Sequence, residues 1–323
     1  MKTKILISIL AIVAAAGCSI PGIPGMGTST TFGGGQGLEI SSFTAQPETL
    51  FSGSTVRVIM EITNQGGTTV PSGSSIAFLT GSNIEFAASR STPLVWLGSN
   101  GGAYQTVKEV KAEDVVRGLS AGTDRISWTL ASPSLTAGQT RTDHLIGRLY
   151  SEYQSNAFGS VWVYGETDVD AAKASGRPLE KSSFTYTKGP VGVEVTAQPD
   201  PVVIYGNEKT FSMYIKVTNL QTGTIYQTKN ITYDTTTTNK NLVAEALNKV
   251  FINITKPPDT ILKINNPTDC LGYQELVAGR PTTIVCDFNI TETFTTYKSY
   301  PLSVEVKYGY YTERQATVTV QGR

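Results

Sequence analysis

An internal repeat constrains the fold of this chain more than any other feature of its sequence. The tetrapeptide TAQP at residues 44–47 recurs at residues 196–199, and each copy is followed by a run that ends in Thr-Asn, at residues 60–64 and 215–219. Later matches are residues 135–138 with 276–279, and the tyrosine-rich runs 150–163 with 308–320. Two units of about 150 residues fit the total length of 323 residues.

Both copies alternate apolar and polar residues with a period of two. Val56, Val58 and Met60 fall on one face of a predicted strand, and residues 213–217 repeat the pattern. Such alternation, rich in Thr, Val, Ile and Tyr, indicates half-buried β-strands. Clusters of Gly and Asn, for example at residues 64–67, punctuate the runs. The sequence therefore predicts an all-β chain built as a sandwich or barrel. A helical spacing of apolar residues at 239–250 predicts one short helix.

The N-terminus has the features of an export signal. Lys2 and Lys4 precede an apolar run at residues 5–16, which is too short to span a membrane because a spanning helix needs about 20 residues. The following Ala-Ala-Gly before Cys18 resembles a lipoprotein lipobox. The resemblance implies cleavage of residues 1–17 as a signal peptide and a lipid on Cys18. The alternatives are an ordinary secretory signal that happens to contain a cysteine, and an uncleaved anchor.

Residues 18–37 are rich in Gly, Pro, Ser and Thr and carry no charged side chain. Such a stretch cannot bury a core, so we predict a flexible linker between a lipid anchor and the folded mass. An anchor, a linker and folded domains are the layout of a protein displayed on the outer face of the cell membrane.

The motif order gives a family resemblance. A strand, the xAxP motif of residues 44–47 and 196–199, a Gly or Asn turn, and a strand ending in xVTN, as at residues 216–219, resemble the start of CARDB-like and related immunoglobulin-like domains. These are common in exported archaeal and bacterial surface proteins. The resemblance implies two tandem immunoglobulin-like β-sandwiches, at residues 38–188 and 189–323, and it implies no reaction.

Charge and composition exclude several function classes. The 26 basic residues balance 26 acidic ones, and nucleic-acid binding generally needs a basic surplus. With a single histidine, His144, a His-rich metal enzyme is hard to build, and we expect no cofactor. Asp168 and Asp170 are candidate Ca²⁺ ligands, but they lack the Gly-punctuated spacing of a calcium loop. We interpret them as a solvated acidic turn and predict no metal site.

Residues 118–122 match the G-x-S-x-G pattern of a hydrolase nucleophile elbow. That elbow places Ser120 between a preceding strand and a following helix, whereas here a strand is predicted after the serine. Asp143 and His144 are adjacent, so on a strand they point to opposite faces and cannot form a catalytic pair. We interpret the motif as a Gly-rich turn and predict that the chain is not an enzyme.

Cys270 and Cys286 remain once Cys18 is set aside. An even pair in an exported chain favours a disulfide, which we expect to join two strand ends around a turn at residues 278–281. Asn-x-Thr sequons at Asn230, Asn253 and Asn289 are candidate glycosylation sites, all in the second unit. Their meaning depends on a host with Asn glycosylation.

These features predict a non-catalytic surface lipoprotein for adhesion, recognition or spacing. Its expected partners are the membrane, through the lipid, and a surface protein or glycan. One alternative is a structural subunit of a surface layer or filament that self-associates by strand addition at sheet edges. The other is a serine hydrolase around Ser120.

Overall fold

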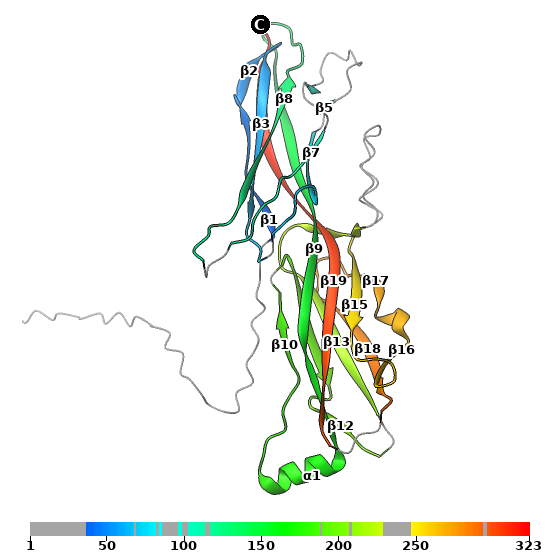
Figure 1. Cartoon of the computed structure of the whole chain (residues 1–323). Coiled ribbons are helices and arrows are strands. Elements are labelled where there is room, and N and C mark those ends of the chain that lie inside the picture. The colour runs from blue at the N-terminus through cyan, green and yellow to red at the C-terminus, as the bar shows by residue number, and fades with distance from the viewer. Residues whose placement is uncertain are drawn as a thin grey trace, which may run out of the picture. The chain divides into compact units, whose positions relative to one another are not determined.

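The chain is an all-β protein, as its alternating pattern predicts (Figure 1). The computed structural model describes residues 37–67, 69–81, 84–85, 96–98, 103–113, 117–187, 189–206, 209–228, 247–292 and 296–323. The strands of the first half are β1 (Leu38–Gln46), β2 (Thr49–Phe51), β3 (Thr55–Asn64), β4 (Ser75–Gly81), β5 (Ile84–Glu85), β6 (Trp96–Gly98), β7 (Tyr104–Thr106), β8 (Thr123–Ala131), β9 (Thr140–Gly165) and β10 (Ser183–Tyr186). Those of the second half are β11 (Val191–Gln198), β12 (Val202–Ile204), β13 (Thr210–Asn219), β14 (Thr224–Tyr226), β15 (Lys249–Thr255), β16 (Leu262–Asn265), β17 (Gly272–Glu275), β18 (Thr282–Ile290) and β19 (Lys298–Gln321). Among the described residues the helices are α1 (Glu166–Ser175) and the short 3₁₀ turn η3 (Pro267–Asp269).

The strands form three sheets. The first sheet has the order β1-β3-β8-β6-β5, and the third has the order β11-β13-β18-β16. The second sheet lies along β17-β15-β19-β9-β4-β7, with β10 and β12 beside β9, and β2 and β14 beside β19. Most neighbours are antiparallel; the pairs β5–β6, β2–β19 and β9–β12 are parallel.

Two long strands form the centre of the second sheet. β9 has 26 residues and β19 has 24, and they pair antiparallel from Lys298↔Val163 to Gln321↔Thr140 (Figure 1). At a rise of about 3.4 Å per residue, the paired stretch is roughly 80 Å long. Most strands have only five or six residues, so these two are much longer than one sandwich layer needs.

Each long strand contributes to two separate cores. Leu145 and Leu149 of β9 lie in the first core with Val318 and Val320 of β19, between the first and second sheets. Further along β9, residues 157–163 contribute to the second core, where they meet the first half of β19 and the strands of the third sheet. The predicted ranges 38–188 and 189–323 stay a prediction, but each range supplies residues to the core formed mainly by the other.

The sequence repeat is visible in the hydrogen bonds. β1 pairs with β3 from Leu38↔Asn64, and β11 pairs with β13 from Val191↔Asn219. The Asn64 Oδ1 accepts from the Gly66 N–H at 2.9 Å, and the Asn219 Oδ1 accepts from the N–H two residues later at 3.2 Å. Both asparagines thus fix the turn after their strand, as residues with a short amide side chain commonly do. The number of immunoglobulin-like domains stays a prediction.

The helices differ from expectation. The predicted helix at 239–250 falls largely outside the described residues, and its last two residues begin β15. A helix that the sequence analysis did not predict, α1, follows β9 directly. The Gly165 N–H donates to the Asp168 carboxylate at 3.2 Å, and Gly176 ends the helix with φ 67°, a left-handed conformation that favours glycine. Val169 and Ala172, three residues apart, are its buried face.

Candidate functional site

The midpoint of the two long strands is a tyrosine joint between the two cores. Tyr153 of β9 lies opposite Tyr308 of β19, with ring centroids 6.0 Å apart. The Tyr308 hydroxyl accepts from the Val191 N–H at 3.2 Å and lies 3.0 Å from the Ser155 hydroxyl, which donates to the Val191 carbonyl at 2.7 Å. The Tyr153 hydroxyl accepts from the Leu38 N–H. In each repeat, the backbone N–H at the start of the first strand is therefore bonded by the hydroxyl of a tyrosine from a long strand.

Other tyrosines pack around this joint. The Tyr310 hydroxyl accepts from the Gly223 N–H at 2.7 Å, and the Tyr226 hydroxyl donates to the Ser151 carbonyl at 3.3 Å. Gly309 is required here, because a Cβ at that position would lie 1.9 Å from the Tyr226 ring. A tyrosine whose ring is buried while its hydroxyl bonds a backbone group is suited to holding a chain segment in place.

The joint is built to stay uncharged. Burial raises the pKa of Tyr153 and of Tyr310 to about 12, and it raises the pKa of the fully buried Tyr308 still further. Desolvation is the largest cause in each case, because a charged phenolate loses more hydration free energy than a neutral phenol when it is buried. At neutral pH these hydroxyls are therefore structural hydrogen-bonding groups.

Two hollows flank the joint. The first, of about 380 Å³, is lined by residues of β1, β14 and β19, among them Glu39, Glu313 and Arg314, each of which belongs to an ion pair. Arg314 lies 3.5 Å from Glu39, and Glu313 lies 3.0 Å from Arg148. These pairs are largely exposed, so each contributes little to stability.

The second hollow, of about 400 Å³, is lined by Gly37, Val70, Glu152, Tyr153 and other residues of the joint. Burial raises the pKa of the Glu152 carboxyl. Gly37, the first described residue, lines this hollow beside Tyr153.

An aromatic cluster lies near the end of β9 that belongs to the second core. Trp162 and Tyr164 of β9 approach Tyr297, which precedes β19, with ring centroids 6.0 and 5.6 Å away. The Arg177 guanidinium lies 5.6 Å from the centre of the Tyr297 ring, a cation–π contact. Tyr164 is buried and its hydroxyl accepts from the Glu180 N–H at 2.9 Å, whereas Tyr297 is 43% exposed. Within the cluster, Tyr164 is therefore held in place, whereas Tyr297 is open to solvent.

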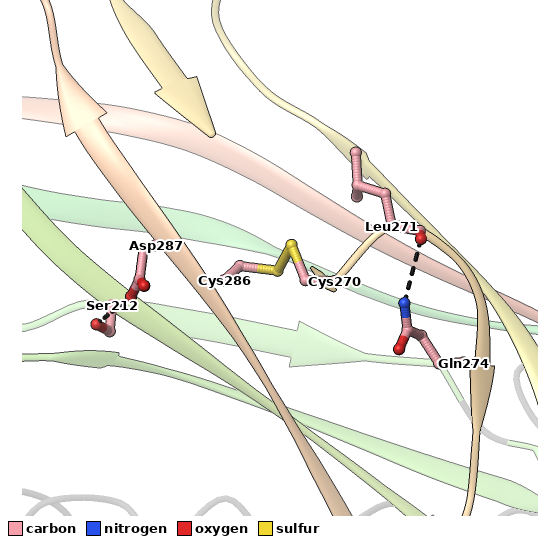
Figure 2. The surroundings of a disulfide bond; sticks show 6 residues. All are labelled: Ser212, Cys270, Leu271, Gln274, Cys286 and Asp287. Atoms are coloured by element: carbon pink, nitrogen blue, oxygen red, sulfur yellow. Dashed lines mark hydrogen bonds between the residues drawn. A yellow bond between two sulfur atoms is a disulfide. The ribbon is translucent and has the colours of Figure 1, made fainter. Parts of the chain in front are cut away.

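The disulfide is confirmed, and its position corrects the predicted geometry. Cys270 and Cys286 are both buried, with Cα atoms 5.4 Å apart (Figure 2). Cys286 lies in β18 of the third sheet, and Cys270 lies just before β17 of the second sheet. The turn at residues 278–281 lies between two strands as predicted, but these strands belong to two sheets, and Cys286 lies within β18 and not at a strand end. The bond therefore links the second sheet to the third sheet across the second core.

The candidate modification sites fall in different parts of the chain. Cys18 and Asn230 lie outside the described residues. Asn253 is exposed on β15, opposite Glu305 of β19, and Asn289 is half-buried on β18. Glycosylation at these asparagines stays a prediction.

The candidate calcium ligands lie in α1 and not in the acidic turn that the sequence suggested. Asp168 accepts the Gly165 N–H, and Asp170 lies 4.0 Å from Lys173 one helical turn away. Among the residues that the structure describes, no group of three or more His, Cys, Asp or Glu side chains is placed to hold a metal ion. A helix N-terminus with acidic residues in its first turn is a common stabilising arrangement.

The G-x-S-x-G residues have the predicted local context. Ser120 lies in the loop that leads into β8, so a strand follows the serine. Asp143 is buried against Arg141, whose guanidinium donates to it at 2.7 Å. The neighbouring His144 is exposed, with its Nδ1 3.5 Å from the Thr317 hydroxyl, so the two side chains face opposite ways as predicted.

The edge of the third sheet is closed by side chains at two points. Val195 of β11 donates its N–H to the Tyr186 hydroxyl and accepts from it through its carbonyl, both at 3.3 Å. Val191 is bonded in the same way by Tyr308 and Ser155. These backbone groups are the ones that strand addition would use, so at these points β11 is protected as natural edge strands often are.

Sequence reasoning missed the two aromatic arrangements. It identified the tyrosine-rich runs as part of the repeat, and Tyr308 and Tyr310 lie in the second core. It did not pair Tyr153 with Leu38, or Trp162 with Tyr297, because these partners are more than a hundred residues apart. The alternation of residues 158–164 was the one local signal that Trp162 and Tyr164 share a face.

Within the described residues, no helix is long and apolar enough to cross a membrane. No family model matches the chain, and no curated protein matches it.

Three solved structures are similar at a low level. An elastase-activated Escherichia coli alpha-2-macroglobulin has a TM-score of 0.22 and 11% identity; the match covers 88% of this chain but 22% of that one, so this chain spans about a fifth of its length. The collagen-binding domain of the Erysipelothrix rhusiopathiae surface protein RspB has a TM-score of 0.13 and 7% identity, covering 88% and 97% of the two chains. The Enterococcus faecalis MSCRAMM ACE, described as binding its ligands by the collagen hug model, has a TM-score of 0.11 and 8% identity, covering 87% and 94%. Proteins with TM-scores this low need not share a fold.

Proposed function

We propose that this chain is an exported, lipid-anchored surface protein that presents two joined β-sandwiches for non-catalytic adhesion or recognition. Cys18 carries the lipid, and residues 18–37 form the tether. The folded body then acts as a rigid carrier for a binding face held away from the membrane.

One observation carries this proposal: the paired strands β9 and β19 run through both cores. Two sandwiches connected by a single flexible linker would move independently, as domains with small interfaces do. Here a change in their relative orientation must bend two paired strands and disturb the buried tyrosines between them. Such a body suits a spacer or a binding scaffold.

A non-catalytic role agrees with the placement of the only hydrolase-like motif. Asp143 is engaged by Arg141 and faces away from His144. Treatment with a fluorophosphonate probe should leave the protein unlabelled. Labelling that disappears in Ser120→Ala would show that the chain is a hydrolase.

The anchor is tested by Cys18→Ser in the full chain. We expect the variant to leave the membrane fraction and to lack the mass of a lipid, while a matched Ser19→Ala variant keeps both. Protease added to intact cells should degrade the Ser19→Ala protein, because it is displayed outside. If Cys18→Ser stays membrane-bound with an unchanged mass, the protein is not a lipoprotein.

A further inference from the structure

The outward face of the second sheet, where it covers the second core, carries an unusual set of side chains. On β9, residues 157, 161 and 163 point into the core, so Phe158, Ser160 and Trp162 point outward. Their partners on β19 in the same rows are Ser303, Pro301 and Ser299. We call these three rows the aromatic face.

Two rings dominate the aromatic face. Phe158 is 47% exposed, and Trp162 is half-buried against Tyr297. Phe158 and Trp162 are four positions apart along one strand, a distance of roughly 13 Å. At the Trp162 end, the Arg177 guanidinium lies over the Tyr297 ring and helps to hold it in place. The two rings are therefore separate apolar surfaces on the same face of the sheet.

Apart from Pro301, the other positions of the three rows carry hydroxyl groups. Ser160, Ser299 and Ser303 lie in the three rows, and Thr185 of β10 lies beside Phe158. None of the outward positions in these rows holds Leu, Ile, Val, Met or a charged residue. Glu305 and Lys307 of β19, in the rows beyond Ser303, are paired with each other at 3.2 Å.

This combination selects among classes of partner. Two sheets that stack need interdigitating apolar side chains across about 10 Å, and the aromatic face has isolated rings with short polar groups between them. An anionic partner needs unpaired cations, which these rows lack. A neutral sugar chain matches both features, since each pyranose ring has an apolar face of C–H groups and a rim of hydroxyls. The apolar face stacks on an aromatic ring, and the rim bonds to serine and threonine.

We propose that the aromatic face binds a neutral polysaccharide, with one sugar on Trp162 and another on Phe158. This inference rests on the proposed recognition function and names its partner. Asn253 lies in the next row, opposite Glu305. A glycan attached there would cover part of the face and compete with the bound chain.

The test uses the full chain, purified in detergent, and four probes: cellohexaose, chitohexaose, maltohexaose and mannohexaose. Binding is measured by calorimetry and by quenching of tryptophan fluorescence, since Trp162 is partly exposed while Trp128 is buried. We expect at least one probe to bind, with affinity about tenfold weaker in Trp162→Ala and in Phe158→Ala. Phe51→Ala, at a ring 42% exposed on the first sandwich, is the matched control and should bind normally.

Circular dichroism and melting of each variant separate lost binding from lost folding. The inference is overturned if none of the four probes binds, or if both face variants bind as well as the Phe51→Ala control. Sedimentation that shows a dimer lost in Trp162→Ala, without sugar binding, would instead identify the face as a contact between copies. None of these results bears on the anchor, which the Cys18→Ser fractionation tests separately.

Discussion

Cutting the chain between the two repeats should prevent the first repeat from folding. A fragment of residues 37–188 contains β1 to β10 but lacks β19, whose last residues complete the first core. Val318 and Val320 are fully buried there, and β2 pairs with the end of β19. The fragment would also expose Ala157, Val161 and Val163 of β9, which lie in the second core of the intact chain.

The expected cost can be worked from these contacts. Burial of a valine side chain is worth about 1.5–3 kcal/mol, so the two valines alone account for roughly 3–6 kcal/mol. A whole domain is commonly stable by only about 5–15 kcal/mol. The loss of the β9–β19 pairing along residues 312–321 adds to this. The fragment should therefore be largely unfolded at room temperature.

Proton–nitrogen correlation spectra and urea unfolding measure this directly. We expect the intact chain to unfold in one transition and the fragment to give a collapsed spectrum without a cooperative transition. Adding a synthetic peptide of residues 310–323 should restore dispersed signals in part. A fragment with a dispersed spectrum and a melting temperature within a few degrees of the intact chain would refute the reasoning.

A graded change tests the same point. Val318→Ala removes buried methyl groups from the first core and should cost about 2 kcal/mol, including the cavity. Because β19 also enters the second core, hydrogen exchange should speed up in both halves of the chain. Val285→Ala, at a side chain 41% exposed on β18, is the matched control and should change stability little. Faster exchange confined to the first half would show that the two cores are not coupled through β19.

Three further predictions concern the joint and the disulfide. Tyr308→Phe removes the acceptor of the Val191 N–H and should lower the free energy of unfolding by about 1–3 kcal/mol in urea titrations, whereas Tyr205→Phe at an exposed ring should have no effect. The pKa of Tyr153 and of Tyr310 is about 12 in the folded chain and about 10 in the unfolded chain, so the folded state keeps these protons to a higher pH. The contribution of these two groups to the free energy of unfolding is therefore fully present below pH 10 and should fall by up to about 1.4 kcal/mol per pH unit per tyrosine as the pH rises to 12. A free energy of unfolding that does not change between pH 10 and pH 12 would contradict this. Replacing both disulfide cysteines with serine should cost about 3 kcal/mol for a loop of this length, and an unchanged urea midpoint would contradict the stabilising role.

The sequence by itself determined the class of the fold and its local pattern. Period-two alternation at Val56, Val58 and Met60 identified strands and their buried face, because side-chain direction on a strand is a local property. The repeat correctly matched β1 with β11 and β3 with β13, and the cysteine pair predicted the disulfide. Helix α1 also had local signals, a Gly before an acidic first turn and Gly176 after it, but the acidic residues were interpreted as a turn.

Only the tertiary structure decided how the two repeats combine. Alternation shows that Val318 and Val161 are buried, but not that each lies in the core built mainly by the other repeat. The hydrogen bond between Tyr153 and Leu38 and the ring contact between Tyr297 and Trp162 likewise depend on how β9 and β19 align. The physical reason is that strand pairing is non-local: a strand's own residues fix its two faces, while its neighbours, its register and its full length depend on backbone hydrogen bonds to distant segments.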